Sequence, residues 1–420
     1  MSRQGPPELG RVLTRVVNEA MRHPDPLQAE LLVSHLLGQV WASQEFGRMD
    51  AVAAMALDAA ATVPAQAPAA PLALRLLAEL APPQVASAMR GQVSVGIPTE
   101  PSWLESVNRV ELVDGITVDD VYGDQTNYVM GLAYLDAQGR RLRSGEHGLV
   151  VLVDHNLHLV KDMFARPGDI VRYFRDSVAS DPSLIGTPLD PQTAATQIAE
   201  HLRITDMTLG ETFGEESAEV RLLVGARLRA ALPPPLEEPH PDPWDVWPQR
   251  KRRSLVTAFL RTQPVAQLLE AGSGVEGEAP PSRDTVRLIA DLLVDYAIDY
   301  GAGDPLRWSP IAAELFLTDW APRKVVWDAE DVPWVAEVLD LFVVYAGRRK
   351  RLPHRWVEMT QDAVAEYAAD FTLAVLDGGR RGPAAQIIEQ MLLDGVDPTD
   401  PVQMQAWIDR YNGGLPPLQP

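Results

Sequence analysis

The chain has 420 residues, of which 46% are hydrophobic and 23% charged, and a formal net charge of −21 at pH 7. This length favours two or three domains, and the acidic balance disfavours general binding to nucleic acid or anionic membranes. The absence of cysteine excludes disulfides, thiolate zinc sites and cysteine nucleophiles. No apolar run reaches the ~18 residues of a membrane span, and Met1–Gly10 lacks the apolar core of a signal peptide. We therefore expect a cytoplasmic protein with no membrane partner.

Residues 1–95 are expected to form a helical N-terminal domain. Apolar residues recur at helical spacing between Leu9 and Met21. The next helix is expected to begin at Asp25–Gln28, which supplies a capping residue, a proline at the first helical position and a glutamine at the capping-box position. Prolines then interrupt the pattern, so we predict short helices that pack against one another.

Residues 107–164 form the one long stretch in which strand signals outweigh helix signals. In Gln125–Asp136 both alternating faces are largely apolar, which is typical of an inner strand. Leu149–Val153 is a short apolar run that suits burial, and turn residues separate the two strands. We predict a small antiparallel β-meander of three or four strands, with helices covering at least one of its faces.

The remainder of the chain is expected to be helical. Helices predicted near residues 169–179, 191–203 and 215–231 complete an α+β domain over residues 96–232. Proline-rich residues 233–249 are expected to be a linker, and residues 250–420 a helical C-terminal domain with tryptophans in its core. The predicted fold class is therefore α+β and predominantly helical: a small antiparallel β-meander at about residues 107–164, flanked by N- and C-terminal helical domains.

Several segments of the chain each resemble the corresponding segment in one group of proteins. They are Tyr122–Asp124, His147–His155, Lys161–Asp162, Arg307–Pro310, Leu315–Trp320 and Pro322–Lys324. Together they resemble an uncharacterised family of high-GC bacterial, actinobacterial-type proteins with a tryptophan-rich helical C-terminal module. The resemblance implies the domain layout and no established activity.

The densest group of residues capable of chemistry follows the apolar run at Leu149–Val153. Histidine and aspartate are the ligands that a cysteine-free zinc, manganese or iron site needs. A metal-assisted hydrolase would use the candidate catalytic residues Asp154, His155, His158 and Asp162. The candidate metal ligands are His147, Asp154, His155, His158 and Asp124, with Asp119 and Asp120 also near the same turn. The alternative is an ordinary turn, in which Asp and Asn accept hydrogen bonds from nearby backbone amides.

A second candidate is an acidic stripe in the C-terminal half. Arg287, Asp291, Asp295 and Asp299 recur every four residues and share one face of a predicted helix. Such a ladder of carboxylates can bind a divalent cation, or can pair with arginine or lysine from a neighbouring helix. Gly272–Gly277 matches the dinucleotide-binding pattern in letters only, because a helix precedes it, so a connector is expected.

Two basic clusters are candidate anion-binding patches. They are Arg250, Lys251, Arg252 and Arg253, and Arg348, Arg349, Lys350 and Arg351. Nucleic acid is one possible ligand. The alternatives are that the first cluster pairs with linker acids at residues 237, 238 and 242, and that the second complements the dipole at the end of a long helix.

No complete catalytic motif is present in the sequence. We therefore expect a non-catalytic cytosolic binding, scaffold or regulatory protein whose partner is another protein or a second copy of the chain. No cofactor is expected beyond a divalent metal on the hairpin. The alternatives are the metal-assisted hydrolase and a nucleic-acid-associated regulator that uses the two basic clusters.

Overall fold

A computed structural model describes residues 6–20, 22, 26–44, 46–63, 70–90, 103–208, 215–236, 243–271, 279–376, 387, 390–397 and 400–414. The chain divides into two compact units, Met1–Pro239 and His240–Pro420. This division lies within the proline-rich stretch 233–249. The expected cap Asp25, the linker acids Glu237, Glu238 and Asp242, and the Gly272–Gly277 connector lie outside the described residues.

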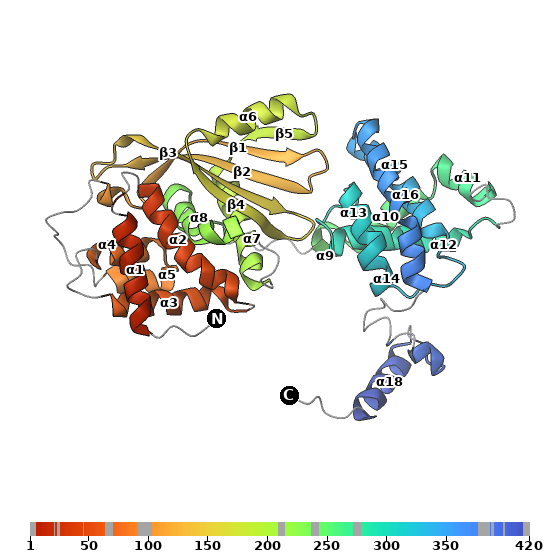
Figure 1. The fold of residues 1–420 in the computed structure, drawn as a ribbon. Coiled ribbons are helices and arrows are strands. Elements are labelled where there is room, and N and C mark those ends of the chain that lie inside the picture. Colours follow the sequence, from red (N-terminus) through yellow and green to blue (C-terminus); the bar gives the residue numbers. More distant parts are fainter. Residues whose placement is uncertain are drawn as a thin grey trace. The chain divides into compact units, whose positions relative to one another are not determined.

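The first unit begins with five helices (Figure 1): α1 (Pro6–Ala20), α2 (Pro26–Ser43), α3 (Arg48–Thr62), α4 (Ala70–Leu80) and α5 (Pro83–Arg90). Their apolar faces meet in a core that includes Leu13, Leu37 and Leu76. The same core contains Tyr134 of the sheet and Leu223 of a later helix. The helices expected to form a separate domain over residues 1–95 therefore share one core with the sheet, as parts of a single unit.

The sheet has five antiparallel strands in the order β4-β3-β2-β1-β5. They are β1 (Val110–Asp120), β2 (Gln125–Leu135), β3 (Arg141–Asp154), β4 (Leu159–Pro167) and β5 (Leu184–Pro188). The predicted α+β fold with an antiparallel meander is thus confirmed. β5 was not predicted, because five residues that include Gly186 and Pro188 give little strand signal. It pairs with β1 at the edge opposite β4.

Three helices cover the two faces of the sheet (Figure 1): α6 (Ile170–Ser180), α7 (Pro191–Met207) and α8 (Glu215–Ala231). Val171 of α6 packs on Val129 and Val150, whereas α7 and α8 pack on the opposite face. Asp169 and Asp190 cap α6 and α7, because each accepts a hydrogen bond from an amide in the first turn. The three helices lie where the sequence predicts them.

Side-chain hydroxyls from α7 and α8 contact the outer side of β4. The Val160 amide donates to Thr205 Oγ1 at 2.8 Å, and the Met163 amide donates to Ser217 Oγ at 3.1 Å. Both hydroxyl residues are fully buried. These bonds hold α7 and α8 against β4, the edge strand of the sheet.

The second unit is helical over its described residues. Its elements are α9 (Pro243–Val246), α10 (Gln249–Phe259), α11 (Gln263–Ala271), α12 (Arg283–Asp299), α13 (Pro310–Leu315), a π-helical turn (Phe316–Trp320), α14 (Ala321–Lys324), α15 (Trp334–Lys350), α16 (His354–Leu376) and α18 (Pro401–Gly414). Trp308, Trp327 and Trp334 are buried in its core with Phe316 and Phe342. No helix among the described residues is long and apolar enough to cross a membrane.

Candidate functional site

Asp154 ends β3, and its carboxylate holds the turn that follows. Oδ1 accepts the amides of Asn156 at 3.0 Å and Leu157 at 3.1 Å, and Oδ2 accepts from Gln125 Nε2 at 3.2 Å. Lys161 Nζ lies 3.5 Å from Oδ2. This geometry is that of the turn alternative, in which an aspartate satisfies backbone amides.

The side chains of the other hairpin candidates lie in separate places and have different hydrogen-bond partners. His158 is exposed and has a positive φ of 56°, while Asp162 accepts from the Met163 amide and from Ser217 Oγ. Asp124 is buried, and its carbonyl accepts the His155 amide. His147 precedes Asp154 by about 23 Å along β3, at ~3.3 Å per residue. Among the described residues, no three His, Cys, Asp or Glu side chains are grouped to hold a metal ion.

His155 does meet one of the aspartates noted beside the hairpin, through a hydroxyl. Thr126 Oγ1 lies 2.8 Å from His155 Nε2 and donates to Asp119 Oδ1 at 2.5 Å. Burial raises the pKa of Asp119, and the neighbouring charge of Asp120 adds to this effect. The three side chains form a short hydrogen-bonded relay, and the buried Thr126 at its centre offers little surface to a substrate.

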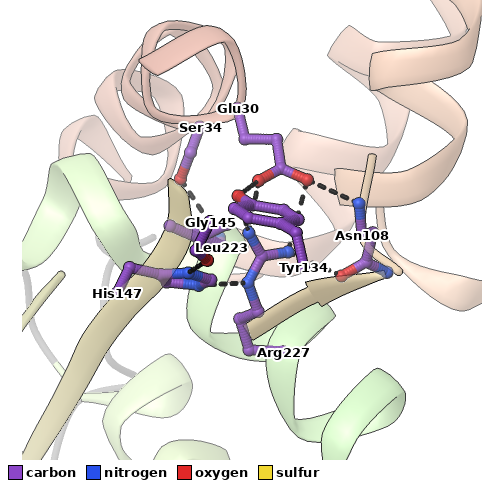
Figure 2. A network of polar contacts seen from close by, with 8 residues as sticks. All are labelled: Glu30, Ser34, Asn108, Tyr134, Gly145, His147, Leu223 and Arg227. Atoms are coloured by element: carbon purple, nitrogen blue, oxygen red, sulfur yellow. Dashed lines mark hydrogen bonds and ion pairs between the residues drawn. The ribbon is translucent and has the colours of Figure 1, made fainter. Parts of the chain in front are cut away.

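A fully buried ion pair joins distant parts of the first unit (Figure 2). Arg227 of α8 donates to both carboxylate oxygens of Glu30 of α2, and to Asn108 Oδ1 at 2.9 Å. The Tyr134 hydroxyl of β2 also donates to Glu30. Glu30, Arg227 and Tyr134 are at most 1% exposed. A buried ion pair is stable only when further hydrogen bonds satisfy its remaining atoms, as they do here.

His147, one of the candidate metal ligands, completes this network. Its Nε2 accepts from Arg227 Nε at 3.2 Å, and its Nδ1 donates to the Gly145 carbonyl at 3.3 Å. Burial and, to a smaller extent, the charge of Arg227 lower the pKa of His147 to about 3, and the hydrogen bond to the Gly145 carbonyl opposes both. The imidazole is therefore neutral at physiological pH. Burial opposes the charge of Arg227, yet Glu30 and Tyr134 raise its pKa above the usual value.

In the second unit, the acidic stripe and the first basic cluster pair with each other. Arg252 is 2% exposed, and its Nη1 donates to Asp295 at 2.8 Å and to Asp299 at 2.9 Å. Nη2 bonds the second oxygen of Asp299, and Nε donates to the Trp247 carbonyl. This is the helix-pairing alternative for the stripe. Burial raises the pKa of Asp291, while Arg287 lowers it.

The second basic cluster ends α15, as its dipole favours. Arg348, Arg349 and Lys350 occupy the last turn, and Lys350 Nζ lies 2.5 Å from Asp304 Oδ2. The Arg349 guanidinium lies 5.8 Å from the centre of the Tyr345 ring, and Arg351 caps the helix with a left-handed backbone. The arginines are exposed, and anion binding at this cluster stays a prediction.

A pocket of about 640 Å³ lies between α7 and α8, at residues that no sequence motif marks. Its α7 wall is the face that carries Ala195, Ala199, Leu202, Arg203 and Asp206. Its α8 wall carries Arg221, Leu222, Gly225, Leu228 and Arg229, and Leu232 follows directly after the helix. The first residues of α3, the α4–α5 junction and Pro233–Pro235 close its sides. The volume falls in the range of about 300–1,000 Å³ that is typical of small-molecule sites.

The pocket has a charged end and an apolar end. At the charged end, Asp206 accepts from Trp41 Nε1 at 2.8 Å and from Nε and Nη2 of Arg221. Buried Arg48 stacks on the Trp41 ring, and burial lowers its pKa while Asp206 opposes this shift. At the other end, Gln192 Nε2 donates to the Pro234 carbonyl at 2.8 Å. α7 and α8 therefore run antiparallel along the whole pocket.

Comparison with protein-family models, curated proteins and solved structures finds no match for this chain. The resemblance noted in the sequence therefore stays a hypothesis. The pocket and the polar networks must be interpreted from their own chemistry.

Removing Arg227 will destabilise the first unit strongly. Arg227→Met leaves the carboxylate of Glu30 buried without its cation, and we expect a loss of about 3–5 kcal/mol in the free energy of unfolding. The double variant Glu30→Met/Arg227→Met removes both charges and should recover most of this loss. Exposed Arg229→Met on the same helix is the control, with an effect below about 0.5 kcal/mol. Hydrogen exchange of β2 and β3 peptides in urea measures all three; equal effects of Arg227→Met and Arg229→Met would contradict the prediction.

Neutral His147 makes the first unit less stable in acid. The unfolded chain binds a proton on this residue near pH 6.5, whereas the folded chain binds it only near pH 3. Between these values the unfolded state holds more protons. This residue therefore lowers the free energy of unfolding by about 1.4 kcal/mol for each unit by which the pH decreases. His147→Gln keeps an acceptor for Arg227 and should remove this part of the slope. An unchanged slope between pH 6.5 and 4.5 would show that His147 is not the titrating group.

Lysine cannot replace Arg252 in the second unit. An ammonium group lacks the planar fork that bonds Asp295, Asp299 and the Trp247 carbonyl together. We expect Arg252→Lys to cost roughly 2 kcal/mol in the free energy of unfolding, and exposed Arg250→Lys to cost almost nothing. Hydrogen exchange of α10 and α12 peptides provides the comparison. Equal protection from hydrogen exchange in the two variants would show that the guanidinium of Arg252 does not hold α10 and α12 together.

Proposed function

We propose that this protein works by binding rather than by catalysis, and that the pocket between α7 and α8 binds a small molecule with an apolar body. The observation that carries the proposal is the pocket itself: two facing helices present leucine, alanine and methionine side chains, with a few polar groups at one end. Small-molecule sites have this mixture of an apolar lining and a few oriented polar side chains. The proposal keeps the binding role expected from the sequence and adds a ligand for the first unit.

The alternative of a metal-assisted hydrolase receives less support from the hairpin. Asp154 and Asp162 already accept backbone and hydroxyl hydrogen bonds. His158 is exposed, and His147 belongs to the Glu30–Arg227 network. A hydrolytic site needs its base, nucleophile and substrate within about 3 Å of one another. These residues are instead used one by one in turns and buried contacts.

Nile red, an uncharged apolar dye, tests the pocket. Ala199 lines the α7 wall, so Ala199→Phe places a ring where the dye would bind. We expect wild-type protein to bind Nile red with an increase in fluorescence, and Ala199→Phe to weaken binding by about tenfold or more, since ~1.4 kcal/mol of lost burial is tenfold. Ala230→Phe is the matched control, because Ala230 is exposed on α8 and does not line the pocket.

Unfolding curves of both variants establish that they fold. Folded Ala199→Phe that binds Nile red as tightly as Ala230→Phe would refute the proposed site.

A further inference from the structure

Gly225 leaves a small gap on the pocket face of α8, and two arginines border it. A Cβ built at Gly225 would lie 3.3 Å from Nη1 of Arg221 and 3.4 Å from Nη1 of Arg229. The two arginines come four residues before and four residues after the glycine, so they lie on one face of the helix. Two guanidinium nitrogens thus converge on the point where any other residue would place its Cβ.

Asp206 holds one of these arginines in place and does not occupy the gap. Both of its oxygens accept from Arg221, through Nε at 3.0 Å and Nη2 at 2.5 Å. This bidentate pairing fixes the guanidinium plane and leaves Nη1 directed to the Gly225 side. A like charge from Arg229 lies beside it, and an anion between the two cations would offset their repulsion.

The balance of charge in the pocket also favours an anion. The described lining residues include the arginines at positions 48, 203, 221 and 229, against the aspartates at positions 50 and 206. This cationic lining occurs in a chain whose formal net charge is −21. Arginine forks bind carboxylate and phosphate oxygens with paired N–H donors.

The apolar end of the pocket begins one turn from the gap. α7 and α8 run antiparallel, with Asp206 beside Arg221 at one end and Gln192 beside Pro234 at the other. Leu228, Leu232 and Pro233–Pro235 therefore extend away from Gly225 toward the second end. A ligand with its charged head over Gly225 would lie with its body along this apolar wall.

We propose that the pocket binds a single-chain amphipathic anion. Its carboxylate or phosphate head lies between Arg221 and Arg229 over Gly225, and its hydrocarbon chain lies along Leu228, Leu232 and the prolines. This inference rests on the proposed function, because it names the class of ligand for the same pocket.

Three ligands with one hydrocarbon chain test the inference: dodecanoate, dodecyl phosphate and uncharged dodecan-1-ol. The two anions are measured below their micelle concentrations and the alcohol below its solubility limit, on the full chain, by displacement of Nile red. We expect at least one of the anions to bind about tenfold or more tightly than the alcohol, as charged hydrogen bonds contribute ~1.5–3 kcal/mol. Arg229→Gln should weaken anion binding about tenfold and leave the alcohol unchanged. Arg172→Gln, at an exposed arginine of α6, should change neither.

Gly225→Leu fills the gap with a residue that favours helix. It should abolish the preference for the anion, while Ala230→Leu on the same helix keeps it. The anion that binds more tightly shows whether the ligand carries a carboxylate head, as a fatty acid does, or a phosphate head. Equal affinity for the anions and the alcohol, with both blocked by Ala199→Phe, would overturn this inference and leave the pocket proposal standing. Failure of Nile red and all three ligands to bind folded protein would overturn both.

Discussion

The first unit depends on one buried ion pair, between Glu30 of α2 and Arg227 of α8. Its partners come from the segment before β1, from β2 and from β3, so five parts of the chain meet at one point. Neither charge can be removed alone without leaving the other unpaired away from water. The N-terminal helices are thereby fixed to the sheet and to the helix that forms one wall of the pocket.

The sheet and most helices could be predicted from local pattern, because alternation, caps and prolines act over a few residues. The two apolar faces of Gln125–Asp136 predict β2, and the helix predicted near residues 191–203 is α7. The merging of the N-terminal helices with the sheet could not be predicted, since it depends on contact between Glu30 and Arg227, which are distant in sequence. Nothing adjacent to either residue distinguishes it from an exposed charge on an amphipathic helix.

The candidate site shows the same limit of sequence reasoning. The aspartates and histidines of the hairpin are adjacent in sequence and therefore suggest a site, yet most of them serve the turn or buried contacts. The acidic stripe and the first basic cluster were each noticed, but their pairing through Arg252 needs the positions of two helices. The pocket uses ordinary helix positions such as Ala199, Leu228 and Gly225, which form no motif. The one local hint was a glycine within an otherwise favourable helix.

The hydroxyl groups of Thr205 and Ser217 have a consequence for association between copies. An outer strand with free amides is a template on which another chain can extend the sheet. On β4, two of those amides already have buried partners from α7 and α8. A second chain could pair with these two amides only by separating α7 and α8 from the sheet, so this part of β4 is closed to sheet extension.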